Sequence, residues 1–105
     1  FTYIDDTVKA IFSVIKKPYK NIIPFHTFNI GNGKSRKLIE YLNLIELNLN
    51  KKAKIKKLPL QKADIKKTHS DISQLKKYTN YRPKVSIEVG IKKFIDWYLK
   101  YYKLD

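Results

Sequence analysis

The chain opens with FTYIDDTVKAIFSVI, residues 1–15, where an extended segment runs directly into an amphipathic helix. The segment Thr2 to Ile4 predicts a short strand, and Asp5 or Asp6 then offers a carboxylate that caps the helix. We expect this helix to end at Pro18, because proline cannot continue a helix. The apolar residues that recur at helical spacing in this stretch are Val8, Ile11, Phe12 and Ile15.

Two further short strands are predicted downstream. His26 to Ile30 is rich in residues that favour strands, and the turn from Asn29 to Gly33 closes it. Lys54 to Lys56 predicts a strand that keeps its lysines in water. Pro59 then breaks regular structure and opens a loop.

Three further helices follow from capping residues and apolar periodicity. Ser35 is the expected N-cap of a helix over 36–48, Asp71 caps a short helix over 72–78, and Ser86 caps the last helix. The sequence therefore predicts a small α+β unit of about four helices and a few short strands, in a single domain over residues 1–105. The apolar positions of the last helix are Ile87, Ile91, Phe94, Ile95, Tyr98 and Tyr102.

The composition excludes several classes of protein. A hydrophobic fraction of 43% in 105 residues favours a folded domain over a disordered tail. The chain has no cysteine, which excludes disulfides, thiolate zinc sites and thiol nucleophiles and fits a reducing, cytoplasmic compartment. No apolar run is long enough to span a bilayer. His26 and His69 have no partners placed to complete a metal site or a catalytic triad.

The formal net charge of +14 raises a rival interpretation, a free-standing Lys-rich module that binds nucleic acid or another polyanion. The densest basic stretch is Lys51 to Lys67. Arg36 and Arg82 are the only arginines, whereas phosphate and base recognition relies on the bidentate guanidinium. The lysines are also spread over the whole chain, so we do not expect nucleic-acid binding to be the main role.

Four segments in fixed order carry a resemblance to a known family. They are FTYIDD at 1–6, FNIGNG at 28–33, LPLQKAD with THSD at 58–71, and the stretch from YRP to WY at 81–98. Together they resemble the C-terminal part of an extended short-chain dehydrogenase/reductase, most closely the nucleotide-sugar epimerases that act on UDP-glucuronate. Phe1 lies inside the first motif, so we expect the chain to be a fragment of a longer protein.

The resemblance implies that the catalytic half of the family lies upstream of this chain. The family binds NAD on a Gly-rich turn that opens a helix, whereas this chain has only Gly31, Gly33 and Gly90. The family also uses a tyrosine four residues before a lysine, and none of the eight tyrosines here has that lysine. We therefore expect no catalytic residue and no cofactor in this fragment, with NAD held by the missing N-terminal Rossmann domain.

The same resemblance implies a set of substrate-binding residues. Phe1 and Tyr3 would contact the nucleotide, with packing of the first helix as the alternative for both. Asn29 would hydrogen-bond the nucleotide-sugar, or else satisfy the backbone of its own turn. In the loop after Pro59, Gln61 would lie at the diphosphate and Asp64 at the ribose hydroxyls.

The loop sequence departs from the UDP-glucuronate epimerases, which usually have Pro and Gly where this chain has Lys62 and Ala63. Asp71 is expected to be a helix cap and not a ligand. The parent reaction implied is C4 epimerisation of a UDP-hexuronic acid or UDP-hexose for surface polysaccharide synthesis, with decarboxylation and dehydration as open alternatives. We also expect self-association, or low stability, through apolar faces of the first helix and of Phe28 and Ile30 that the missing domain would cover.

Overall fold

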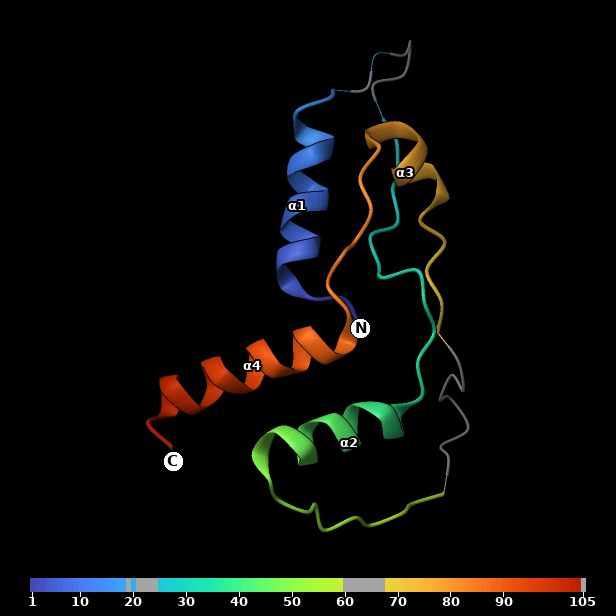
Figure 1. The fold of residues 1–105 in the computed structure, drawn as a ribbon. Coiled ribbons are helices and arrows are strands. Elements are labelled where there is room, and N and C mark those ends of the chain that lie inside the picture. The colour runs from blue at the N-terminus through green and yellow to red at the C-terminus, as the bar shows by residue number, and fades with distance from the viewer. Residues whose placement is uncertain (19, 21–24, 60–67, 105) are drawn as a thin grey trace. The chain divides into compact units, whose positions relative to one another are not determined.

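The computed structural model describes residues 1–18, 20, 25–59 and 68–104. These residues form four helices, α1 (Ile4–Ile15), α2 (Leu38–Leu49), α3 (Ser73–Thr79) and α4 (Ile87–Tyr102), and no strand (Figure 1). The predicted α+β class is therefore wrong, and the described part of the protein is all-α.

The expected strands fail because a strand needs a partner as well as local propensity. Within the described residues, 25–30 and 51–59 carry no ladder, and Ile4 already belongs to α1. Tyr3 does have extended dihedral angles (φ −71°, ψ 143°), so the local preference was correct while the pairing was not.

The chain divides into two compact units, each built from segments distant in sequence. One unit comprises residues 1–34 and 69–85 and contains α1 and α3. The other comprises residues 35–68 and 86–105 and contains α2 and α4. The expectation of a single domain over 1–105 stays a prediction.

In the first unit, α1 and α3 pack together around Ala10 and Leu75, which are fully buried. The end of α1 is joined to α3 by Lys17, whose ammonium donates to the Tyr78 carbonyl (2.8 Å), while the Tyr78 hydroxyl donates to the Lys17 carbonyl. The ring of Phe28 stacks on Tyr78 with centroids 5.0 Å apart. The segment before α2 is thus held against α3 by aromatic contact.

In the second unit, α2 and α4 pack together, with Ile95 buried. The predicted cap of α4 is confirmed, since the Val89 amide donates to Ser86 Oγ (3.4 Å). The predicted cap of α2 is wrong. Helix α2 begins at Leu38 after Lys37, whose backbone amide donates to the Glu40 carboxylate (3.2 Å), so a side chain one turn inside the helix replaces Ser35.

Within the part of the chain that the structure describes, no helix combines the length and apolar character needed to cross a membrane.

Candidate functional site

Three of the five predicted substrate-binding residues lie in the first unit. Phe1 is 86% exposed, Asn29 is exposed, and Tyr3 is half-buried as the residue that precedes α1. The other two, Gln61 and Asp64, lie outside the described residues, so their roles remain predictions. Within the described residues, the first unit therefore holds the three predicted site residues whose positions are known.

The opening segment lies beside the loop that carries Asn29. A Cβ built on Gly31 would lie 2.6 Å from Ser70 Cβ and 3.9 Å from Thr2 Oγ1. Only a residue without a side chain allows this approach, so Gly31 is the point where three segments meet. The structure thus brings the segment that carries Phe1 and Tyr3 next to the segment that carries Asn29.

The same loop is shaped by a second glycine. Gly33 has a φ of +70°, a left-handed conformation that a side chain would strain. A Cβ there would also approach the side chain of Ile72 to 3.2 Å. The predicted change of direction after Asn29 therefore rests on both glycines, and the loop packs on the residues that lead into α3.

A buried carboxylate, Asp6, holds the candidate site together. Asp6 is 1% exposed and lies in the first turn of α1. Its oxygens accept hydrogen bonds from the backbone amides of Lys84 (3.1 Å) and Val85 (2.9 Å) and from the Tyr81 hydroxyl (2.8 Å). We call Asp6 with residues 81–85 the Asp6 anchor, because it fixes the start of α1 to a segment more than 70 positions away.

The hydrogen bonds of the Asp6 anchor change the acidity of both partners. Burial alone would raise the pKa of Asp6, but the amides of Lys84 and Val85 and the Tyr81 hydroxyl outweigh it, so the pKa is lowered. Burial, together with the hydrogen bond to Asp6, raises the pKa of Tyr81 to about 12. At neutral pH the carboxylate is ionised and the phenol is protonated, which is the arrangement that the hydrogen bonds require.

Asn32 links the Asp6 anchor to the candidate site. Its side-chain amide donates to the Val85 carbonyl (3.3 Å). The segment 81–85 is therefore held by α1 on one side and by the loop of Asn29 to Gly33 on the other. The sequence did not reveal this role, because Asp6 was interpreted as a local helix cap and its partners are remote in sequence.

The predicted cap of α3 is wrong, because the residue at the N-cap is Ile72, which makes no side-chain cap. The Asp71 carboxylate, one residue earlier, accepts from the amide of Ser73 (2.9 Å), the first residue of α3, and this hydrogen bond lowers the pKa of Asp71. His26 pairs with the Gln74 side chain (3.1 Å). Among the described residues, no group of three or more metal-ligating side chains comes together.

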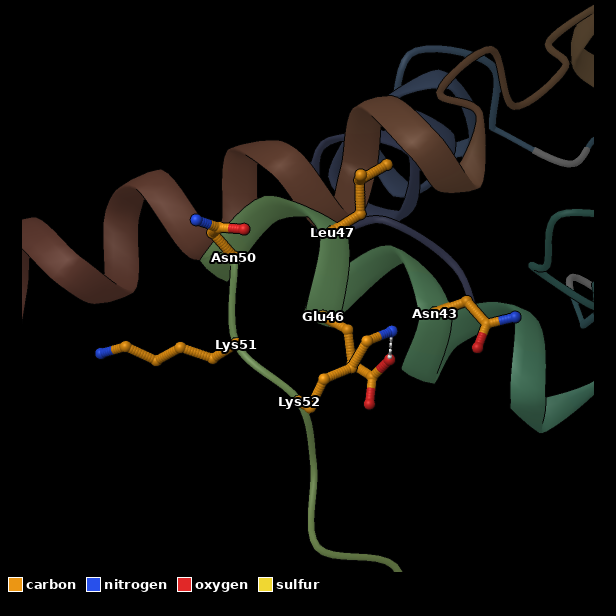
Figure 2. A pocket seen from close by; sticks show the side chains of 6 residues that line it. All are labelled: Asn43, Glu46, Leu47, Asn50, Lys51 and Lys52. Carbon is orange, nitrogen blue, oxygen red and sulfur yellow. Dashed lines mark hydrogen bonds and ion pairs between the residues drawn. The ribbon is translucent and has the colours of Figure 1, made fainter.

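A shallow hollow in the second unit lies at the C-terminal end of α2 (Figure 2). Its one carboxylate, Glu46, accepts from the ammonium of Lys52 and the amide of Ala53, both at 2.8 Å. These bonds fold the chain back over the helix end, so the hollow is explained by the local structure. The residues that line it, none of them a predicted ligand, are Asn43, Glu46, Leu47, Asn50, Lys51 and Lys52.

Comparison with known proteins identifies the family. The chain is 34% identical over 117 residues to protein CapI of Staphylococcus aureus and 37% identical over 98 residues to a UDP-glucuronate 4-epimerase of Thermodesulfobacterium geofontis. These matches cover 98% and 92% of the chain. An uncharacterized protein of Methanocaldococcus jannaschii is 46% identical over 95% of the chain. No family profile matches.

The protein is a nucleotide-sugar epimerase relative, and the chain spans only about a third of the length of these curated relatives (29%, 35% and 29%). It belongs to the UDP-glucuronate 4-epimerase family and corresponds to a C-terminal part of its members.

Proposed function

We propose that the chain is the substrate-side part of an enzyme that epimerises UDP-glucuronate at C4. The observation that carries this proposal is the match of nearly the whole chain to proteins named UDP-glucuronate 4-epimerase, in Thermodesulfobacterium geofontis and in Arabidopsis thaliana. The structure supports it by bringing the segment of Phe1 and Tyr3 against the loop of Asn29. The same proposal extends to UDP-hexoses as substrates of C4 epimerisation.

The proposed contacts follow from the chemistry of a nucleoside diphosphate sugar. The exposed ring of Phe1 offers an apolar surface to the uracil, and the hydroxyl of Tyr3 offers a hydrogen bond. The Asn29 amide can both donate and accept, as recognition of uracil or sugar hydroxyls requires. Gln61 and Asp64 complete the proposed set, at the diphosphate and the ribose.

Electrostatics favours an anionic substrate. UDP-glucuronate carries a diphosphate and a carboxylate, whereas the chain has a formal charge of +14. A positive field of this kind raises the rate at which an anionic ligand encounters the protein. The absence of cysteine fits the further proposal that the reaction takes place in the cytoplasm and supplies surface polysaccharide synthesis.

The residues of this chain do not fit the NAD that the family implies. Gly31 is packed against Ser70 and Gly33 against Ile72, while Gly90 lies inside α4, so none opens a helix toward a pyrophosphate. Residues outside this chain would hold the cofactor, and the chain alone is expected to show no epimerase activity.

Titration of UDP-glucuronate into the isotope-labelled chain tests the proposed site. We expect chemical-shift changes at Phe1, Tyr3 and Asn29. Asn29→Ala should weaken binding about five- to ten-fold, the effect of losing one or two hydrogen bonds. Asp64→Ala should do the same by removing the acceptor for the ribose.

Asn43→Ala is the matched control, since Asn43 is an exposed asparagine on α2 in the other unit. Binding by this variant should equal that of the unchanged chain. Shifts around Asn43 with none at Phe1, Tyr3 or Asn29, or equal losses in the Asn29 and Asn43 variants, would contradict the proposed site.

A further inference from the structure

Helix α4 carries an exposed aromatic surface that the proposed nucleotide-sugar site does not use. The helix spans Ile87–Tyr102, and its buried residues are Gly90 and Ile95. Trp97 is 53% exposed and Tyr101 is 65% exposed. We call this surface the aromatic face of α4; its members are Phe94, Trp97, Tyr98, Tyr101 and Tyr102.

The rings of the aromatic face contact one another and form a continuous surface. Trp97 stacks on Tyr101 with centroids 5.3 Å apart and lies 5.9 Å from Phe94. Phe94 also lies 6.1 Å from Tyr98, which lies 4.8 Å from Tyr102. Neighbouring rings therefore contact one another along the helix and form one extended aromatic strip.

Lysines border the aromatic face. Lys93 lies four residues before Trp97 and Lys100 three residues after it, and at this spacing both are neighbours of Trp97 on the helix surface. Asp96, the residue before Trp97, is paired with Lys92 at 2.9 Å. Lysines thus flank the strip, in a chain whose formal net charge is +14.

This combination disfavours two other partners that could cover an aromatic face. A second copy would bring its own +14 charge, and an antiparallel pair of α4 helices would set the Lys93 and Lys100 edges against each other. Single-stranded nucleic acid stacks its bases on open ring faces, whereas Trp97 and Tyr101 already stack on each other. An anionic lipid surface satisfies both the apolar strip and the lysine border.

We propose that the aromatic face of α4 docks onto an anionic membrane surface. In this arrangement α4 lies in the plane of the interface, with Trp97 and the tyrosines at the level of the lipid headgroups. Lys93 and Lys100 extend beside them to the lipid phosphates, because long basic side chains keep their charge at the polar boundary. The proposal does not depend on which nucleotide-sugar the first unit binds.

Vesicle binding tests the proposal. The chain is mixed with vesicles of phosphatidylcholine alone and with vesicles that also contain phosphatidylglycerol, and binding is measured by co-sedimentation and by Trp97 fluorescence. We expect binding and a shift of the emission to shorter wavelength only with the anionic vesicles, and release in high salt. Since Trp97 is the only tryptophan, the emission reports on this face directly.

Two sets of variants locate the binding surface. Phe94→Ser with Tyr101→Ser should lower vesicle affinity at least ten-fold, and Lys93→Gln with Lys100→Gln should lower it about five-fold per lysine. Val89→Ser is the control for the aromatic pair, because Val89 is an exposed apolar residue on the charged side of α4. Lys9→Gln with Lys34→Gln, in the other unit, is the control for the lysine pair.

Equal binding to both vesicle types, or no binding to either, would overturn the proposal. Self-association that disappears in the Phe94 and Tyr101 variant would assign the face to a second copy instead. Binding of a single-stranded oligonucleotide by the same residues, without vesicle binding, would assign it to nucleic acid. Vesicle binding by this chain that is absent from a longer protein containing it would overturn the proposal and assign the face to contact with the added residues.

Discussion

At the scale of single residues, the Asp6 anchor is the contact that the sequence could not reveal. A carboxylate in the first turn of a helix is ordinarily a cap or a favourable charge near the helix N-terminus. The partners of Asp6 are backbone amides, which leave no mark on the sequence, and a tyrosine 75 positions away. Ser86 was predictable as the cap of α4 because its partner, the Val89 amide, lies three residues away.

Replacement of Asp6 should destabilise the first unit strongly. Asp6→Asn keeps the size of the side chain but sets an amide N–H₂ group against the amides of Lys84 and Val85. We expect the free energy of unfolding to fall by about 2 to 4 kcal/mol, the range for breaking charged hydrogen bonds in a buried site. Urea denaturation followed by circular dichroism measures it. Asp5→Asn, in the same turn, should change it by less than about 1 kcal/mol.

The Asp6 anchor also makes the stability of the folded chain depend on pH, with a loss at acid pH and a second loss at alkaline pH. The pKa of Asp6 is lowered on folding, so its contribution is full above about pH 4 and is lost as the pH falls through the folded pKa. The pKa of Tyr81 is raised to about 12, so its contribution is lost as the pH rises from about 10 toward 12.

Thermal melts of the chain and of Tyr81→Phe across pH measure the alkaline part. The melting temperatures of the two proteins should converge between about pH 10 and pH 12, because the phenol that ionises is absent from the variant. If the difference between the two melting temperatures stays constant over that range, ionisation of Tyr81 does not contribute to the loss of stability at alkaline pH.

At the scale of elements, the sequence predicted the helices well and the strands badly. Periodic apolar residues and capping side chains act within one or two turns, so α1, α3 and α4 appear close to their predicted bounds. Strand pairing depends on a partner, and 25–30 is instead held by contacts such as Phe28 on Tyr78. A short extended segment rich in β-branched and aromatic residues cannot by itself distinguish these two outcomes.

The contact of Gly31 with Ser70 offers a test at this scale. Gly31→Ala places a methyl group 2.6 Å from Ser70 Cβ, so the two segments must separate. We expect a loss of about 1 to 3 kcal/mol in the free energy of unfolding, together with weaker UDP-glucuronate binding.

A second substitution, Ser70→Gly in the Gly31→Ala background, should restore most of both losses by removing the side chain that clashes. Denaturation and ligand titration of the single and double variants measure the rescue. If the double variant is no better than Gly31→Ala alone, the close approach of these two residues is not what limits the loop.

At the scale of the whole molecule, α1 exposes apolar side chains that a complete core would cover. Phe12 is 54% exposed and Ile15 is 68% exposed, in agreement with the expectation of an uncovered apolar surface on this helix. Phe28 and Ile30, which we expected to share it, are only half-buried. The other exposed members on α1 are Ile4, Val8 and Ile11.

We therefore predict that the isolated chain is marginally stable or self-associates. Exposed apolar area contributes nothing to folding, and a chain of this size has little core to compensate. Light scattering and thermal melting at several protein concentrations distinguish the two outcomes. A strictly monomeric protein that melts well above the mesophilic range of about 45 to 65 °C would contradict the prediction.

The Asp6 anchor has a further consequence for how the protein is made on the ribosome. Helix α1 is translated long before its partners Tyr81 and Val85, and α2 is translated in between. At about 5 to 20 residues per second, roughly 4 to 16 s pass between the synthesis of Asp6 and the synthesis of the residues whose amides donate to its carboxylate. During that interval the Asp6 carboxylate can bind only water, so the first unit cannot close before residues 81–85 have been synthesised.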